Sequence, residues 1–347
     1  MATLADLPIP LNLAPMEAKL VDDLPEGPGW RYEPKWDGFR CLAFRAGDKV
    51  ELKAKSGKSL TRFFPDMVEV LETLPVDRFV VDGELTIPVG GELSFEALQA
   101  RLHPAESRVR KLAAEHPATL VLFDCLVDAD GRPLLTGPLS ARRRELESLY
   151  ARFGPTDRIR LSPGSEDIEE ARRWLARTGV ALDGVIAKQL DDPYAPGERA
   201  MLKVKRLRTA DCVVGGFRYE QGSKRVGSLL LGLYDDEGRL DHVGFTSTIT
   251  DDERPALTQR LEALAGEPGF TGSAPGGPSR WSTGRSAEWT PLKPELVVEV
   301  RYDQVTGGRF RHGTRLMRWR PDKAPRQCTC EQLKSEAAPA RLLAEMG

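Results

Sequence analysis

Lys35 lies in a run of residues whose types could together attack a phosphate, Glu33-Pro34-Lys35-Trp36-Asp37-Gly38-Phe39-Arg40. A lysine attacks a phosphorus atom only as the neutral amine, and nearby cations or a metal ion favour that form. Asp37 could hold the metal or a hydroxyl group, and Arg40 could place two N–H donors on ribose or phosphate oxygens. Gly38 would let the backbone approach closely. A surface turn before a strand explains the same residues, so the run alone does not decide the chemistry.

Three segments further along carry residue types suited to holding a nucleotide. Asp82-Gly83-Glu84-Leu85 follows a predicted strand, and Phe123-Asp124 is predicted at the end of another. An aromatic ring such as that of Phe123 offers a face on which a base can stack. Asp183-Gly184-Val185-Ile186-Ala187-Lys188 supplies a carboxylate that could help hold a divalent cation near phosphates. Ordinary turns and a core phenylalanine remain open as explanations of these segments.

Two further segments could act on phosphate charge. Alternation along a strand places Lys203 and Lys205 on one face, where two cations repel unless an anion or water separates them. Such a pair could stabilise negative charge during phosphoryl transfer. Arg320-Pro321-Asp322-Lys323 is another charged segment, near the end of the chain. A solvated edge strand and a charged tail are the alternatives.

These six segments, in this order, resemble the motifs of the covalent nucleotidyltransferases, which comprise DNA ligases, RNA ligases and mRNA-capping enzymes. The resemblance covers about residues 33 to 323 and is strongest to the small bacterial ATP-dependent DNA ligases of the C type. It implies that Lys35 becomes covalently linked to AMP from ATP, with Mg²⁺ or Mn²⁺ present. The AMP would then activate the 5′-phosphate of a nick in duplex DNA, and the 3′-hydroxyl would seal it, in DNA repair.

The resemblance also implies roles for individual residues. The catalytic residues would be Lys35, Asp37, Asp322 and Lys323. The nucleotide would be bound by Glu33, Arg40, Glu84, Phe123, Lys188, Lys203, Lys205 and Arg320, and the metal would lie near Asp183 and Asp37. The chain departs from the family pattern at two positions. Asp183 replaces the usual glutamate, and Lys55, in Ala54-Lys55-Ser56-Gly57, replaces an arginine that grips the 5′-phosphate.

Three other functions remain open at this point. An RNA ligase and a GTP-using capping enzyme share the motifs, and labelling with ATP or GTP, followed by nicked DNA or RNA, would separate them. A non-catalytic nucleic-acid-binding protein is a rival from another class. Four retained lysines argue against it: Lys35, Lys188, Lys203 and Lys205.

The elements that must position these residues divide the chain into two predicted domains, 1–205 and 210–347, with a hinge at about 206–209. The first is predicted as an α+β nucleotidyltransferase (adenylation) domain with antiparallel sheets. Its strands are expected at 41–44, 79–81, 85–87, 120–123, 185–187 and 201–204, and its helices at 140–153 and 168–178. The second is predicted as an OB-fold β-barrel. Its strands are expected at 210–219, 228–235, 242–247, 296–302 and 315–319, with a helix at 251–265 and a Gly/Pro loop at 266–278.

Two segments of the second half are locally basic. Residues 203–230 carry seven cations against two acids, and residues 301–326 carry eight against two. Gly-rich stretches at 221–224 and 306–309 could let the backbone approach a duplex. We expect nicked duplex DNA to contact Lys55, Arg208, Arg218, Lys224, Arg225, Arg309, Arg311 and Arg315, with solvated loops as the alternative. Because no long segment precedes the first motif, we expect weak, strongly salt-dependent nick binding and reliance on partner repair proteins. We also expect the protein to be a monomer.

Composition excludes several other classes of protein. The 347 residues include 50 Lys and Arg against 52 Asp and Glu, so the total charge gives no sign of a nucleic-acid partner. The five cysteines and four histidines lack the spacing of a zinc site. We find no signal peptide and no segment of membrane-spanning length, and therefore expect a soluble protein of the bacterial cytoplasm.

Overall fold

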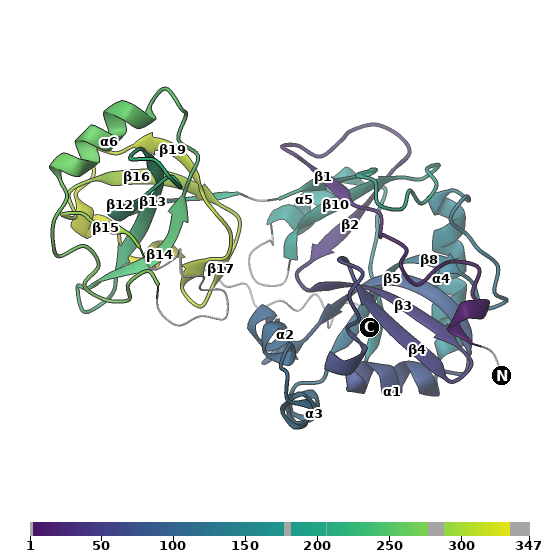
Figure 1. The fold of residues 1–347 in the computed structure, drawn as a ribbon. Helices are drawn as coiled ribbons and strands as arrows, with labels where there is room; N and C mark the ends of the chain where they lie inside the picture. The colour runs from purple at the N-terminus through teal and green to yellow at the C-terminus, as the bar shows by residue number, and fades with distance from the viewer. Residues whose placement is uncertain (1–2, 177–181, 206, 277–287, 334–347) are drawn as a thin grey trace. The chain divides into compact units, whose positions relative to one another are not determined.

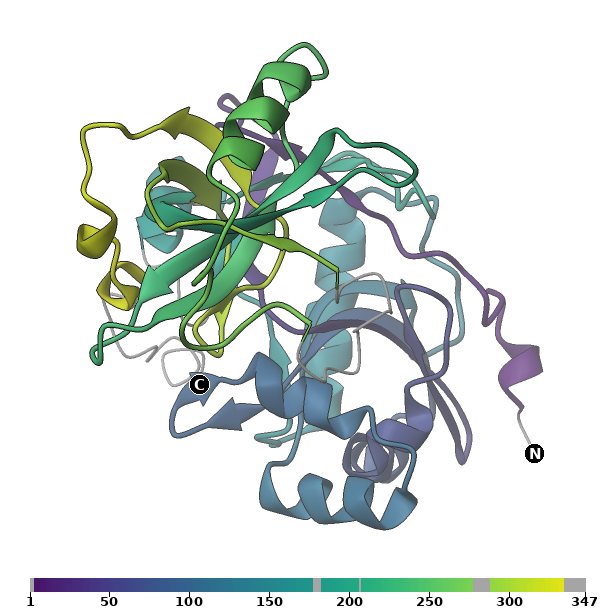
Figure 2. The ribbon, with the colours of Figure 1, turned by 60° about the vertical axis from the view of Figure 1, so that its left-hand side comes forward.

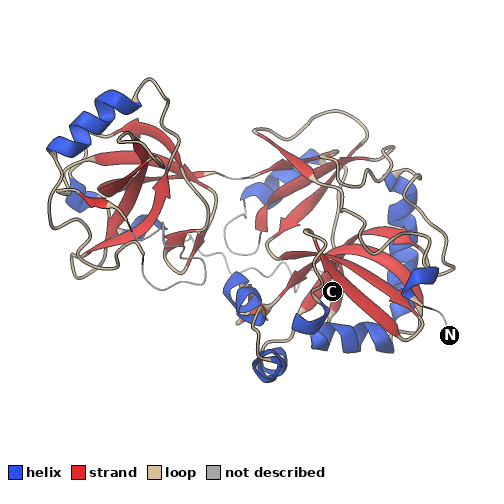
Figure 3. Cartoon of the chain, viewed as in Figure 1, coloured by secondary structure: helices blue, strands red, loops and turns tan. Residues whose placement is uncertain are grey.

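A computed structural model describes residues 3–176, 182–205, 207–276 and 288–333. The chain divides into two compact units, and the second begins at Leu207 (Figures 1 and 3). Parts of several predictions lie outside the described residues: 1–2 and 177–181 of the first domain, which include 177–178 of a helix; 206 of the hinge; and 277–287 and 334–347 of the second domain, which include 277–278 of a loop. No helix in the described part of the chain is both long and apolar enough to cross a bilayer.

The first unit contains two main sheets with both antiparallel and parallel pairs. The larger sheet has the strand order β4-β3-β5-β8-β9, and the other has the order β1-β11-β10-β2. The strands are β1 Ala18–Val21, β2 Trp30–Trp36, β3 Phe39–Ala46, β4 Lys49–Ala54, β5 Arg78–Thr86, β6 Pro88–Val89, β7 Glu92–Leu93, β8 Thr119–Val127, β9 Ile159–Leu161, β10 Leu182–Gln189 and β11 Met201–Val204. The predicted antiparallel pairing is confirmed for most neighbouring strands of this unit. Two pairs differ, because β8 pairs with β9 and β1 pairs with β11 in parallel. A helix joins β8 to β9, and such a crossover returns the chain in the same direction.

Helices pack on both sheets of this unit (Figure 1). They are α1 Pro65–Thr73, α2 Phe95–Arg101, α3 Glu106–Glu115, α4 Leu139–Phe153 and α5 Ile168–Ala176. The predicted helices at 140–153 and 168–178 are confirmed as α4 and as the described part of α5. Helix α4 packs against β8, and α5 packs against β10 and β2.

Strand alternation sorts the side chains of these sheets between an apolar core and the space between the sheets. On β3, Cys41 and Ala43 belong to the core with α1 and α4, whereas Leu42 and Phe44 belong to a different cluster. Arg40, two residues before Leu42, therefore faces away from the helix-covered core. The same alternation places Glu33 and Lys35 on one face of β2, and Asp82 and Glu84 on one face of β5. On β10 the register is irregular between Leu182 and Gly184, next to Asp183.

The second unit is built on one curved sheet with the order β14-β13-β12-β16-β19, in which β15 also pairs with β12. Its elements are β12 Arg208–Tyr219, β13 Val226–Tyr234, β14 Leu240–Thr246, α6 Arg254–Ala263, β15 Thr290–Pro291, β16 Val297–Tyr302, β17 Val305–Thr306, β18 Arg309–Phe310 and β19 Arg315–Trp319. Helix α6 packs against β13 (Figure 2). The five predicted strands and the helix are confirmed, and the unit is consistent with an OB fold. Among the described residues the pairing does not close into a barrel, since only an isolated bridge, Thr246 to Thr314, links the two ends of the sheet.

Two segments predicted at the ends of strands are in fact strand interiors. Asp82 to Glu84 lie within β5, and Phe123 and Asp124 lie within β8. Gly83 is required by close packing and not by a turn, because a Cβ there would lie 2.7 Å from the carbonyl oxygen of Val121 on β8. The two predicted strands at 79–81 and 85–87 are thus one continuous strand.

Candidate active site

A cavity of about 810 Å³ lies in the first unit and is lined from both sheets. Its lining includes the predicted nucleophile, Lys35, and most of the residues predicted to bind the nucleotide: Glu33, Arg40, Glu84, Phe123, Lys188 and Lys203. These residues come from β2, β3, β5, β8, β10 and β11. The fold therefore gathers on one cavity side chains that are spread over most of the first unit's sequence.

Lys35, on β2, shares a carboxylate with a second lysine. Asp183 on β10 pairs through Oδ2 with Lys35 and, at 3.0 Å, with Lys205. The Asp183 side chain is 7% exposed and that of Lys35 is 25% exposed. Gly184 permits this arrangement, because a Cβ there would overlap the carbonyl group of Val204 on β11. The amine of Lys35 therefore lies in the cavity beside the later lysines, not in bulk solvent.

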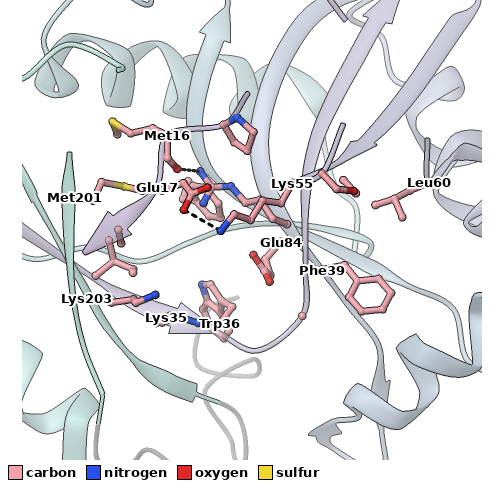
Figure 4. A pocket seen from close by; sticks show the side chains of 18 of the residues that line it. Met16, Glu17, Lys35, Trp36, Phe39, Lys55, Leu60, Glu84, Met201 and Lys203 are labelled. Carbon is pink, nitrogen blue, oxygen red and sulfur yellow. Dashed lines mark hydrogen bonds and ion pairs between the residues drawn. The ribbon is translucent and has the colours of Figure 1, made fainter. Parts of the chain in front are cut away.

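Lys203 lies on β11 and points into the same space as Lys35 (Figure 4). Burial lowers the pKa of the Lys203 ammonium, and the charges of Lys35 and Lys205 lower it further. Lys205 lies beyond the last residue of β11, so the prediction that both lysines share one face of a strand is wrong. The two amines nevertheless lie in one cluster of positive charge, which suits an anion.

The ring of Phe123 is contacted by two cations. Arg40 Cζ lies 4.6 Å and Lys188 Nζ lies 5.0 Å from the ring centroid. Lys188 Nζ also donates to Glu33 Oε2 at 2.7 Å, and the two side chains are 4% and 3% exposed. This wall combines an aromatic face with buried polar groups, which are the two features that a purine base needs.

Arg40 is held by a network that the sequence analysis missed. Its Nε and Nη2 donate to the two oxygens of Asp82, each at 2.5 Å, and Nη2 also reaches the Met16 carbonyl at 3.2 Å. The Tyr194 hydroxyl donates to Asp82 at 2.6 Å and accepts from the Met16 N–H at 3.0 Å. The guanidinium expected on ribose or phosphate oxygens is therefore paired with protein groups. One feature of the sequence could have pointed to Asp82: it lies two residues before Glu84, so the two side chains lie on the same face of a strand.

Glu84 is the cavity carboxyl with the most altered ionisation. Burial raises the pKa of Glu84 from 4.5 to about 7, although Lys35 and Arg40 oppose the shift. Asp37, in the turn between β2 and β3, is close enough to add to the raised pKa of Glu84. With its pKa raised to about 7, Glu84 could donate a hydrogen bond to a nucleotide hydroxyl when protonated and accept one from it when ionised.

Lys55 lies at the cavity on the loop after β4 and pairs with Glu17 at 2.9 Å (Figure 4). The backbone of Glu17 is fixed by hydrogen bonds to Glu198 at 2.7 Å and to Met201 at 3.1 Å. The ion pair thus joins the segment next to β11 to the segment after β4. Any phosphate that bound Lys55 would compete with Glu17 for it.

In the second unit, Arg320, Asp322 and Lys323 form a charged cluster with Asp211 of β12. Arg320 Nη1 donates to Asp211 Oδ1 at 2.8 Å, and Lys323 Nζ donates to Asp211 Oδ2 at 2.9 Å. The hydrogen bond from Arg320, 2.8 Å long, lowers the pKa of the Asp322 carboxyl to about 2. Asp211 had no role in the sequence analysis, where it counted only as an opposing charge.

The residues predicted to bind DNA in the second unit differ in their surroundings. Arg309 Nη2 lies 2.7 Å from His242 Nδ1, and burial together with the Arg309 charge lowers the pKa of His242 to about 3. His242 is therefore neutral and accepts this hydrogen bond. Gly307 and Gly308, with φ of +56° and +73°, form the two-residue turn of the β17–β18 hairpin. These glycines are explained by the turn, without a need for contact with DNA.

The remaining basic residues of this set are partly or fully exposed. Some have partners within the protein: Arg208 Cζ lies 5.3 Å from the Tyr302 ring centroid, Arg225 pairs with Glu220 at 3.1 Å, and Arg311 donates to Thr306 Oγ1 at 3.1 Å. Burial lowers the pKa of Arg218. Lys224 and Arg315 have exposed side chains.

Two family models together match most of the chain. The ATP dependent DNA ligase domain matches residues 15–205, and the ATP dependent DNA ligase C terminal region matches residues 222–323. The first match covers the unit that holds the lysine-lined cavity, and the second covers the unit that holds the Arg320–Lys323 cluster. Both models describe parts of enzymes that use ATP to join DNA.

Individual relatives agree with these matches over nearly the full length. The chain is 46% identical to DNA ligase C2 of Mycolicibacterium smegmatis, over 95% of this chain and 96% of the relative. It is 43% identical to DNA ligase C of Mycobacterium tuberculosis, over 94% of this chain and 95% of the relative. A solved structure from a study of Lig E DNA ligases has the same fold, with a TM-score of 0.54 and 16% identity over 88% of this chain and 99% of the other. The chain belongs to the ATP-dependent DNA ligase family.

Proposed function

We propose that this ligase seals nicks in duplex DNA through a lysyl-adenylate, with Lys35 as the nucleophile. The observation that carries the proposal is the position of the Lys35 amine. It lines the cavity together with Lys203 and contacts the carboxylate that also holds Lys205. An amine surrounded by cations and one carboxylate is arranged to meet an anionic centre.

In the first step Lys35 Nζ attacks the α-phosphorus of ATP. An N–P bond forms, the bond from that phosphorus to the bridging oxygen breaks, and pyrophosphate leaves. Asp183, in contact with the amine, orients it and is in position to accept its proton. Lys203 and Lys205 stabilise the charge that develops on the phosphate.

The rest of the nucleotide would be held by the other cavity residues. Glu33, Phe123 and Lys188 form the wall for adenine, and Glu84 meets the ribose hydroxyls. Arg40 braces this wall through Asp82 and the face of Phe123. Arg320, Asp322 and Lys323 act on the leaving pyrophosphate, as the family resemblance implies.

A divalent cation, Mg²⁺ or Mn²⁺, would be held at this site by protein carboxylates together with phosphate and water oxygens. In the described part of the chain, no group of three His, Cys, Asp or Glu side chains could hold a metal ion. Mg²⁺ is commonly bound by one or two carboxylates, with phosphate and water oxygens completing the set. Asp183 and Asp37 would be the protein contribution, and the ion would neutralise phosphate charge.

The later steps take place on DNA. The AMP passes from Lys35 to the 5′-phosphate of the nick, and the 3′-hydroxyl then displaces AMP. We propose that Lys55 and the arginines on and around β18 and β19 contact the DNA backbone, so that nick affinity falls steeply with added salt. DNA repair is the process in which we place this reaction, with other repair proteins as partners.

A labelling experiment tests the role of Lys35. The full-length Lys35→Arg variant, incubated with radiolabelled ATP and Mg²⁺, should form no covalent adenylate. Lys49→Arg is the matched control, because Lys49 on β4 is 64% exposed and should label normally. Lys35→Arg should still seal nicks that already carry a 5′-adenylate, since that step needs no lysyl bond. Covalent labelling of Lys35→Arg would refute the proposal.

A further inference from the structure

Asp211 pairs with one more cation than the acid that lies beside it in the sheet. It lies on β12 directly opposite Glu299 on β16, so two acids stand side by side on one sheet. Like charges in that position repel. Each acid has an arginine partner: Arg318 Nε donates to Glu299 Oε2 at 2.6 Å, and Arg320 donates to Asp211.

Asp211 differs from Glu299 because it holds two cations of one segment. One oxygen accepts from Arg320 at 2.8 Å and the other from Lys323 at 2.9 Å. The Asp211 backbone is itself fixed, since its N–H donates to Gln332 Oε1 at 2.9 Å and its carbonyl accepts from Gln332 Nε2 at 3.1 Å. Asp211 is 9% exposed, whereas the side chains of Arg320 and Lys323 are 18% and 26% exposed.

We infer that Asp211 is a positioning residue for the reaction with ATP: it holds Arg320 and Lys323 together as one preformed pair of cations. This inference rests on the role proposed above for those two residues on the leaving pyrophosphate. A lysine side chain is flexible and carries a compact charge, so its position depends on a fixed partner. Holding the pair in place before ATP arrives removes the ordering cost from the reaction.

The test is to follow the separate steps of the reaction in Asp211→Asn. Self-adenylation with ATP should slow by about tenfold, the loss expected for one charge-assisted hydrogen bond. Release of AMP from the adenylated enzyme by inorganic pyrophosphate should need about tenfold more pyrophosphate. Sealing of nicks that already carry a 5′-adenylate should stay within about twofold of wild type, and this step also reports that the variant is folded.

Glu299→Gln is the matched control, because it removes the same charge from the neighbouring acid and breaks the pair with Arg318. It should leave all three rates within about twofold of wild type. An Asp211→Asn protein that self-adenylates at the wild-type rate, or faster, would overturn the inference. A faster rate would mean that Asp211 competes with pyrophosphate for the cations.

A double-mutant cycle separates this inference from the proposed function beneath it. If Asp211 acts through Lys323, adding Asp211→Asn to Lys323→Ala should slow self-adenylation less than it does in wild type. Equal slowing in both backgrounds overturns the route through Lys323. If Lys323→Ala and Arg320→Ala both self-adenylate normally, the proposed role of the segment fails and the inference fails with it. If those two are slow and Asp211→Asn is not, only the inference fails.

Discussion

The raised pKa of Glu84 makes the stability of the ligase depend on pH in a predictable direction. Its folded-state pKa is about 7, against 4.5 for the same group in an unfolded chain. Between these values the folded protein binds more protons than the unfolded chain, so its stability falls as the pH rises. Moving the pKa from 4.5 to about 7 corresponds to ~3 kcal/mol, all of which is lost once the pH is above 7.

The perturbation is Glu84→Gln, which keeps the shape of the side chain but cannot ionise. We expect the free energy of unfolding of this variant, relative to wild type, to increase by up to ~3 kcal/mol between pH 4.5 and pH 8. The change in this stability difference between the two pH values is the test, and not the difference at either pH. The amide alters the local hydrogen bonding equally at both pH values, so that effect cancels.

The assay is urea unfolding of the ligand-free protein at several pH values, together with a carbon-13 NMR titration of the Glu84 carboxyl group. Glu96→Gln, on the exposed face of α2, is the control and should leave the pH dependence unchanged. If the NMR midpoint lies near 4.5 and Glu84→Gln follows the wild-type stability at every pH, then burial does not govern this group and the reasoning is wrong.

Three further predictions concern the cavity. Glu33→Gln leaves the buried ammonium of Lys188 without its anion, so we expect unfolding in urea to show a loss of about 3 kcal/mol; a change within error would mean that water reaches the pair. Arg40→Lys replaces a two-pronged contact with Asp82 by a single charge, and self-adenylation should fall roughly tenfold in a radiolabel assay; a rate equal to wild type would contradict the bracing role. Gly38→Ala places a Cβ against the β5 backbone and should lower stability by about 2 kcal/mol in thermal unfolding, whereas an unaltered melting temperature would show that the turn can move.

Local patterns predicted much of the fold, because they report on features within one element. The apolar periodicity of α4 and the apolar runs of β11, β12 and β19 gave bounds within a few residues of those observed. The Asp82-Gly83 pair misled, since Asp-Gly is a common turn and only the nearness of β8 shows why glycine is needed in a strand. The parallel partners β1 and β9 were missed because they are short and their pairing is non-local.

The order of the motifs predicted most of the residues that line the cavity. The residues that the motifs did not predict are those that act through contacts between distant segments. Asp82, Tyr194 and Met16 hold Arg40 only because the fold brings three separate segments together. The proposed role of Asp211 likewise depends on its contact with Lys323, which lies more than a hundred positions later in the chain. The spacing of residues along a sequence does not predict such contacts between distant segments.

The parallel pairing of β1 with β11 has a practical consequence for anyone who shortens this protein. Residues 18–21 contain no motif and would be obvious candidates for removal, yet Leu20 is the direct neighbour of Lys203. Without these residues, backbone N–H and C=O groups along one edge of β11 would lack partners, and such unpaired edges pair with strands of other molecules. We therefore expect a chain that begins after Val21 to aggregate during purification, whereas a chain that begins before Pro15 should keep the pairing of β1 with β11.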